Sequence, residues 1–161
     1  LHPDKTRLIA FGRYAMEHAR RVGRKPDTFD FLGFTHYCSR ARSNGWFVVG
    51  RMTIKKRLRA QLQSVKQELR RRLHHDIPTV GRWLHRVLLG HLNYYAVPGN
   101  IACLEIFFRE VAKLWLRALR RRSQRSCTNW QRFSRLRARY FPRVQIIHPQ
   151  PIHRFDAKHP R

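Results

Sequence analysis

The most constraining feature of this sequence is a regular spacing of apolar residues that begins just after residue 53. They follow one another at steps of four, four, three, four and four residues and are Ile54, Leu58, Leu62, Val65, Leu69 and Leu73. This spacing places the six side chains on one face of an α-helix and predicts an amphipathic helix. Because such a helix must bury its apolar face, the sequence also predicts partner elements with apolar faces.

Two further helices supply those partners. Residues 80–91 and 104–119 carry apolar residues at helical spacing, with Thr79 and Asn100 as candidate N-cap residues. Pro78 is expected to end the first long helix. Consecutive amphipathic helices joined by short loops pack most economically as an antiparallel bundle.

A fourth, more basic helix is expected at residues 130–140, opened by a capping-box pair of Thr128 and Gln131. We expect this helix and the tail 147–161, which is rich in proline and histidine, to form an appendage to the bundle.

The first 52 residues have a different pattern. Residues 6–11 are β-prone, and 13–21 suit a brief helix. Two aromatic and β-branched runs, 29–37 and 46–53, flank Ser43-Asn44-Gly45, whose Asn-Gly pair favours a tight hairpin turn. The predicted fold class is therefore α+β and mainly α: a short β-hairpin, an antiparallel helical bundle, and a basic C-terminal helix and tail.

Net charge narrows the function classes. The 161 residues include 35 Lys and Arg against 9 Asp and Glu, a net charge of +26, while 42% of residues are hydrophobic. A chain with this apolar content can bury a core, and its positive charge calls for a polyanion, either nucleic acid or an anionic membrane. Arginine dominates the cations, which favours bidentate phosphate contacts and stacking on bases. The alternative is a GC-rich genome that uses arginine codons freely.

The cations are unevenly distributed. Residues 111–155 hold twelve cations and no acidic residue. Aromatic residues interleave with them, as a surface for phosphate contact and base stacking requires, although most of these aromatics are expected in the core. Arg82, Tyr94 and Tyr95 suit either contact or packing. The remaining candidate contacts are Lys55, Lys56, Arg57, Arg59, Lys66, Arg117, Arg120, Arg121, Arg122, Arg132, Arg135, Arg137 and Arg139.

Catalytic and metal-binding patterns are missing from the sequence. The nine acidic residues are scattered, and Asp27 and Asp30 suit turn formation better than a metal site. Cys38, Cys103 and Cys127 form no Cys-x-x-Cys pair, and the ten histidines form no His-Glu-x-x-His motif. We therefore expect no catalytic residue, no metal and no cofactor in this chain.

The sequence also bears on location. Its longest stretch without charged residues, 87–104, contains Gly90, Asn93 and Pro98 and does not suit a bilayer-spanning helix. No secretory signal is readable, and the chain opens at Leu1 without methionine. We expect a cytoplasmic fragment or truncated reading frame that does not interact with membranes. The sequence indicates no oligomeric state.

Four strings, taken in order, resemble bacterial group II intron reverse transcriptase/maturases. The first two are 2–9 (HPDKTRLI) and 28–38 (TFDFLGFTHYC). The others are 90–100 (GHLNYYAVPGN) and 114–125 (LWLRALRRRSQR). Because the likeness extends over nearly the whole chain, the chain is identified as similar to the C-terminal part of such a protein.

The resemblance implies three segments. Residues 1–52 correspond to the end of the polymerase palm, 53–127 to the helical thumb, also called the maturase-specific domain X, and 128–161 to the start of a basic DNA-binding tail. Within the palm, Lys5 and Thr6 belong to an edge motif. The primer-grip hairpin corresponds to Phe31, Leu32, Gly33 and Phe34.

The resemblance also implies a function. Members of this family grip intron RNA and the template–primer RNA/DNA duplex, contact target DNA, and assist splicing and intron mobility. Their catalytic aspartates and the Mg²⁺ used in polymerisation belong upstream of Leu1, so this piece is expected to bind rather than catalyse.

Two alternatives remain open at the level of sequence. The chain could be a stand-alone basic protein that coats nucleic acid without preference, from a decayed reading frame. It could instead be a membrane-surface protein that uses the amphipathic helix after residue 53. That helix has an apolar stripe of the width typical of a protein core, which favours packing over membrane binding.

Overall fold

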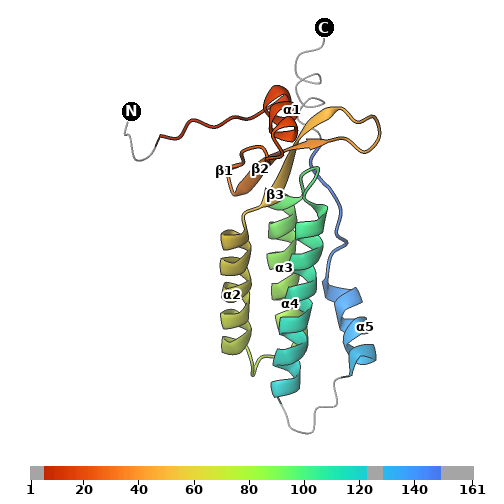
Figure 1. Cartoon of the computed structure of the whole chain (residues 1–161). Coiled ribbons are helices and arrows are strands. Elements are labelled where there is room, and N and C mark those ends of the chain that lie inside the picture. Colours follow the sequence, from red (N-terminus) through yellow and green to blue (C-terminus); the bar gives the residue numbers. More distant parts are fainter. Residues whose placement is uncertain (1–5, 123–128, 150–161) are drawn as a thin grey trace. The chain divides into compact units, whose positions relative to one another are not determined.

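The computed structural model describes residues 6–122 and 129–149, and the chain divides into two compact units, Leu1–Ile54 and Lys55–Arg161. The first contains a short helix and a three-stranded sheet, and the second is helical (Figure 1). The fold is thus α+β and mainly α, as the sequence predicts.

The N-terminal unit is built from helix α1 (Arg13–Arg21) and strands β1 (Phe29–Phe31), β2 (Phe34–Arg40) and β3 (Phe47–Thr53). The strands form an antiparallel sheet in the order β1-β2-β3, with Phe31 opposite Phe34 and Arg40 opposite Phe47. The predicted helix at 13–21 and the predicted hairpin across residues 41–46 are confirmed.

Two details of this unit differ from the expectation. The run 29–37 is not one strand, because a two-residue turn at Leu32 and Gly33 divides it; both have positive φ, 46° and 83°, as a type I′ turn requires. Residues 6–11 form no strand. Asp27 Oδ2 accepts a hydrogen bond from the Ala10 backbone N–H at 3.0 Å, which engages this segment with a side chain instead of a strand.

The helical unit begins with α2 (Lys55–Arg71), α3 (Ile77–Tyr95) and α4 (Ile101–Arg121). The chain reverses direction at each short connection, so α2 and α4 run parallel to each other and antiparallel to α3 (Figure 1). Their apolar faces meet in a core in which Leu84, Leu88, Leu104, Phe107 and Val111 are fully buried. The predicted bundle is therefore present.

The helix caps differ from the sequence-based assignment. Asp76, not Thr79, caps α3: its carboxylate accepts a hydrogen bond from the Thr79 backbone N–H at 2.9 Å. Pro78 lies in the first turn of α3, where its missing N–H costs nothing. Asn100 occupies the N-cap position of α4, but its buried side-chain amide donates to the Tyr95 carbonyl oxygen at 2.9 Å. It therefore fixes the preceding loop.

Helix α5 (Trp130–Tyr140) packs against the bundle more intimately than an appendage would. Phe133 is fully buried, and its ring centroid lies 5.6 Å from that of Trp115 on α4. The Tyr140 ring lies 6.0 Å from the same tryptophan. Asn129 caps the helix by accepting a hydrogen bond from the Arg132 backbone N–H at 2.9 Å, whereas the predicted cap Thr128 lies outside the described residues.

Gly81 makes the approach of α5 possible. A Cβ atom at this position would lie 2.6 Å from Cδ2 of the Tyr140 ring. Gly81→Ala should therefore lower the free energy of unfolding by about 1–3 kcal/mol, because the ring and α5 must shift. Gly90→Ala is the matched control on the same helix: a Cβ there meets no atom within 4 Å, so it should stabilise by up to about 1 kcal/mol. Urea unfolding measures both, and equal gains in stability would contradict this packing.

Candidate nucleic-acid interface

The parallel course of α2 and α4 brings two arginine clusters to the same end of the bundle. The first is Arg70, Arg71 and Arg72 at the C-terminus of α2, and the second is Arg120, Arg121 and Arg122 at the C-terminus of α4 (Figure 1). About fifty residues separate the clusters in sequence. The partial negative charge at each helix C-terminus favours cations there, so both helices tolerate this density of charge.

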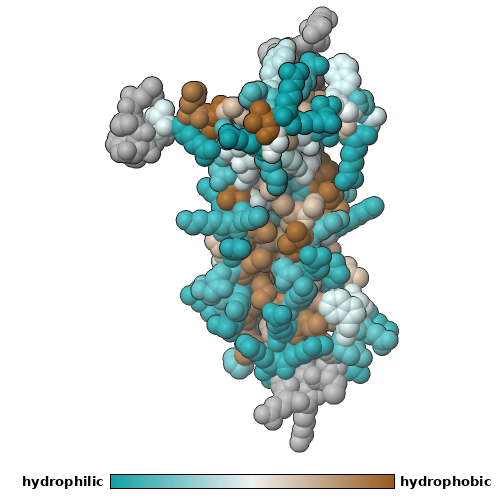
Figure 2. All heavy atoms as spheres, viewed as in Figure 1, coloured by the Kyte–Doolittle hydropathy of each residue, from teal (hydrophilic) through white to brown (hydrophobic). Residues whose placement is uncertain are grey.

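A groove runs between these two helices, and we call it the α2/α4 groove. Its volume is about 190 Å³, and it has an apolar floor of Leu69, Leu73, Leu114 and Ala118. Its cationic lining, called the groove quartet below, consists of Lys66, Arg70, Arg117 and Arg121. Figure 2 shows apolar surface along the bundle with hydrophilic side chains at its borders.

The groove quartet forms no close ion pairs in the part of the chain that the structure describes. Glu68 instead pairs with Arg72 at 2.7 Å and Arg71 at 3.4 Å. Glu110 pairs with Lys113 at 2.8 Å. The hydrogen bond from Lys113 lowers the pKa of Glu110, and the more distant charge of Arg117 adds to this effect. The groove therefore carries a net positive charge.

The spacing within the quartet adds mutual repulsion. Lys66 and Arg70 are four residues apart on α2, and Arg117 and Arg121 are four residues apart on α4. Like charges at this spacing destabilise a helix by a few tenths of a kcal/mol per pair. A polyanion in the groove would relieve this repulsion.

A second basic groove lies between α3 and α5, has a volume of about 480 Å³, and is called the α3/α5 groove. Arg82 and Arg86 from α3 and Arg139 from α5 line it together with His85 and Tyr140. A hydrogen bond of 3.0 Å joins His85 Nδ1 to the Tyr140 carbonyl oxygen, and the Arg139 guanidinium lies 5.5 Å from the centroid of the Tyr140 ring. The structure thus brings together Arg82 and Arg139, which are 57 positions apart in the chain.

The remaining predicted contacts lie elsewhere. Four exposed cations occupy the first turns of α2 and are Lys55, Lys56, Arg57 and Arg59. A helical rise of 1.5 Å per residue places Lys55 about 24 Å from Arg71 along α2. On α5, Arg132, Arg135 and Arg137 are exposed and do not line the α3/α5 groove. The predicted cations therefore divide among several surfaces.

The two tyrosines have different surroundings. Tyr95 is 8% exposed, so it belongs to the core, whereas Tyr94 is 49% exposed. Burial raises the pKa of Tyr95, and a hydrogen bond from the Arg57 side chain partly opposes that rise. Tyr94 remains the candidate for stacking on a base.

The expected primer-grip residues form the tip of the β1–β2 hairpin. Phe31 and Leu32 are 58% and 66% exposed, whereas Phe34 is buried and Gly33 supplies the turn. Thr6 is exposed in an irregular segment, and Lys5 lies outside the described residues.

The described residues contain no cluster of three or more His, Cys, Asp or Glu side chains suited to a metal ion. Asp27 accepts the Ala10 N–H, and Asp30 accepts a hydrogen bond from the Thr35 hydroxyl at 2.5 Å. Both aspartates therefore stabilise local structure. Cys38 and Cys103 are free thiols, and Cys127 lies outside the described residues.

His91 is buried in the core beneath the start of α2. Its Nδ1–H donates to Gln61 Oε1 at 2.9 Å, its ring stacks on Phe107 with centroids 3.8 Å apart, and its buried Nε2 has no hydrogen-bond partner among the described residues. Burial lowers the pKa of His91 to about 4. Adding a proton would place an unsatisfied charge in the core.

This histidine predicts a pH dependence of stability. Between its ordinary pKa of 6.5 and the folded value of about 4, the unfolded chain binds the extra proton. The contribution of neutral His91 to stability is therefore complete only above pH 6.5. As pH falls from 6.5 to 4, the free energy of unfolding decreases by up to about 3 kcal/mol. His91→Gln keeps a donor for Gln61 and should remove this contribution. Urea unfolding across this range measures both proteins; parallel pH profiles would contradict the assignment.

Sequence reasoning missed Arg70 and Arg86 as groove residues. Arg70 lies one helical turn after Lys66, and this spacing could have identified it; Arg86 lies one turn after Arg82 in the same way.

No helix in the described part of the chain is long and apolar enough to cross a membrane. Comparison of the chain with protein-family models, with curated proteins and with solved structures yields no match.

Proposed function

We propose that the chain is the RNA-binding thumb and maturase portion of a group II intron reverse transcriptase, working in the cytoplasm. The observation that carries nucleic-acid binding is the α2/α4 groove, where the groove quartet lines an apolar floor and forms no ion pair among the described residues. The four motif strings in family order support the narrower assignment to intron RNA.

Binding would follow from counterion release. Each phosphate that the quartet neutralises releases a condensed cation, so log affinity falls with log salt by about 0.7 per contact for a single strand and 0.9 for B-form DNA. Four contacts predict a slope contribution of about −3. Arginine suits this role because its planar guanidinium binds a phosphate through two parallel hydrogen bonds. The bound RNA would be held in a compact fold without any bond-making step.

The apolar stripe of α2 favours nucleic acid over a membrane surface. Val65 and Leu69 on that stripe are each 3% exposed within the bundle, so they are not available to enter a lipid headgroup layer. Membrane-surface helices instead keep an entire apolar face free.

A second candidate function is unselective coating of RNA or DNA by a stand-alone basic protein. The spread of cations over the start of α2 and two separate grooves favours this alternative, because a selective site concentrates its contacts. The DNA upstream of the first codon distinguishes the two. An in-frame Tyr-Ala-Asp-Asp segment supports the reverse transcriptase, and a nearby start codon without one supports the coating protein.

Binding to a group II intron RNA, compared with an unrelated structured RNA of equal length at the same salt concentration, tests the proposal. We expect tighter binding of the intron by at least about tenfold, which corresponds to about 1.4 kcal/mol. Equal affinities would reject the intron assignment and leave only general nucleic-acid binding.

A further inference from the structure

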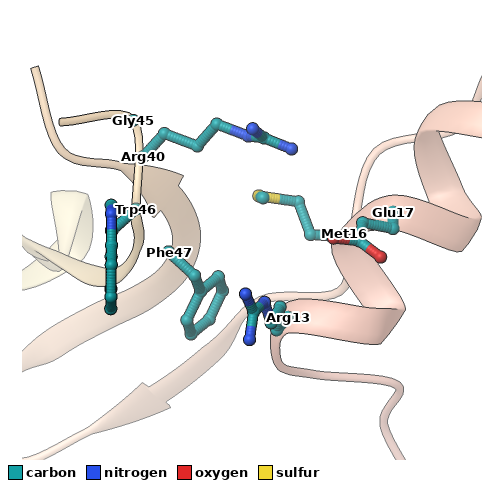
Figure 3. Close-up of a pocket in the computed structure, with 7 residues that line it drawn as sticks. All are labelled: Arg13, Met16, Glu17, Arg40, Gly45, Trp46 and Phe47. Atoms are coloured by element: carbon teal, nitrogen blue, oxygen red, sulfur yellow. The ribbon is translucent and has the colours of Figure 1, made fainter.

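The N-terminal unit contains a pocket of its own. It has a volume of about 330 Å³ and lies between α1 and the loop that joins β2 to β3 (Figure 3). Helix α1 contributes Arg13, Met16 and Glu17, and the other side consists of Arg40, Gly45, Trp46 and Phe47. The volume is at the lower end of the range found for small-ligand sites.

Hydrogen bonds within the loop fix the backbone of Trp46. The Ala41 N–H donates to the Trp46 carbonyl oxygen at 2.8 Å, and the Trp46 N–H donates to Asn44 Oδ1 at 3.2 Å. Gly45 has a φ of 70° and donates its N–H to the Ala41 carbonyl oxygen at 3.0 Å. The loop therefore holds Trp46 in place without the help of a ligand.

Helix α1 is attached to the same sheet. The Cys38 thiol on β2 contacts the Gly12 carbonyl oxygen at 3.7 Å, just before α1. The rings of Phe11 and Phe29 meet edge to face with centroids 4.9 Å apart. Both sides of the pocket thus belong to one folded unit.

The lining combines an exposed aromatic ring with unpaired charges. Trp46 is 72% exposed, so its ring is accessible to a ligand. Figure 3 shows the Arg13 guanidinium beside the Phe47 ring and the Arg40 side chain extending over the pocket. Arg13, Arg40 and Glu17 form no ion pair with any residue in the described part of the chain.

These groups match the parts of a nucleotide. An aromatic ring stacks on any nucleobase, and two guanidinium groups suit the flanking phosphates. Glu17 accepts hydrogen bonds but repels phosphate, so it suits the N–H edge of the base. An acidic peptide would satisfy the arginines yet leave both Trp46 and Glu17 without a complementary group.

We infer that this pocket binds one unstacked nucleotide of a single-stranded nucleic acid, with the base against Trp46 and the phosphates at Arg13 and Arg40. This site lies in the N-terminal unit and does not depend on the intron assignment or on the α2/α4 groove. RNA and DNA offer the same base and phosphate groups, and the experiment below includes both.

The test measures binding of the full chain to three octamers: single-stranded RNA, single-stranded DNA, and an abasic DNA strand with the same phosphates. We expect both base-containing strands to bind more tightly than the abasic strand. Trp46→Ala should reduce this base preference roughly 5-fold to 150-fold, the range that corresponds to stacking on one base. Trp46→Phe should retain part of the preference, because it keeps a ring.

Matched variants separate the pocket from general charge effects. Trp130→Ala removes another exposed tryptophan, 53% exposed on α5, and should leave the base preference unchanged. Arg13→Gln and Arg40→Gln should weaken binding of all three octamers more than Arg42→Gln, which removes a cation of the same loop outside the pocket.

A base preference that survives Trp46→Ala, or falls equally in Trp130→Ala, would overturn the inference. The base preference can depend on Trp46 even if the chain binds intron RNA and unrelated RNA equally. That combination of results would support the pocket and reject the intron assignment.

Discussion

Reversing the groove quartet to glutamate, as Lys66→Glu, Arg70→Glu, Arg117→Glu and Arg121→Glu together, should weaken RNA binding about 100-fold to 1,000-fold. Four surface contacts with phosphate, of about 0.7–1 kcal/mol each, are expected to be lost, which gives this range. All four side chains line the same groove and none forms an ion pair in the part of the chain that the structure describes. Filter binding or fluorescence anisotropy at fixed salt measures the change.

The control for this experiment alters net charge equally at another place. Arg20, Arg21, Arg24 and Lys25 lie at the end of α1 and in the loop after it, all exposed and outside the pockets described above. Reversing them should weaken RNA binding far less. If both quadruple variants lose the same affinity, the RNA responds to total charge and the groove has no special role. Circular dichroism should show unchanged helicity in both.

Trp115→Ala should lower the free energy of unfolding by about 3–5 kcal/mol. Trp115 is 1% exposed, and its ring packs edge to face against Phe133 and Tyr140 and parallel to Phe141 at 6.0 Å. Its removal leaves a cavity where α4, α5 and the segment after α5 meet. Because a domain of this size is only marginally stable, the variant should be largely unfolded at moderate temperature.

Trp130→Ala is the comparison for this prediction. Trp130 has the same side chain but is 53% exposed at the start of α5, so its removal should change the free energy of unfolding by less than about 0.5 kcal/mol. Urea unfolding of both variants measures the difference. A small effect of Trp115→Ala would mean that α5 does not pack on the bundle as described.

The helices could be predicted from sequence because their signal is local. The apolar steps after Ile54 define α2, and the same spacing defines α4 around Phe107 and Trp115. Turn and cap chemistry is also local, yet several residues compete for each role. Asp76 displaces Thr79 as the cap because its carboxylate accepts a hydrogen bond from the Thr79 N–H in the first turn of α3. The turn at Leu32 depends on a positive φ that leucine rarely adopts.

The candidate sites could be predicted only in part, because they depend on tertiary arrangement. The charge of Lys66 and Arg117 is visible in the sequence, but their meeting requires that α3 return the chain so that α2 and α4 run in parallel. The pocket beside Trp46 is harder to foresee. It requires α1 to lie against a loop about thirty residues later, and the Asn-Gly pair in that loop indicates a turn but no ligand site.

The division of cations among several surfaces bears on the choice between selective and unselective binding. If the α2/α4 groove makes most of the RNA contacts, charge reversal of the groove quartet should remove most of the affinity for RNA. A protein that coats RNA evenly should retain most of that affinity through the α3/α5 groove and the start of α2. The affinity of the charge-reversed variant therefore distinguishes the two proposals.

The most direct test of the central claim is the salt dependence of RNA binding before and after the groove quartet is neutralised to glutamine. Each lost phosphate contact removes about 0.7 from the slope of log affinity against log salt. We expect the slope to be shallower by about 3 in the variant Lys66→Gln, Arg70→Gln, Arg117→Gln, Arg121→Gln than in the unaltered chain. Equal slopes would contradict it, because the quartet would then make no contact with phosphate.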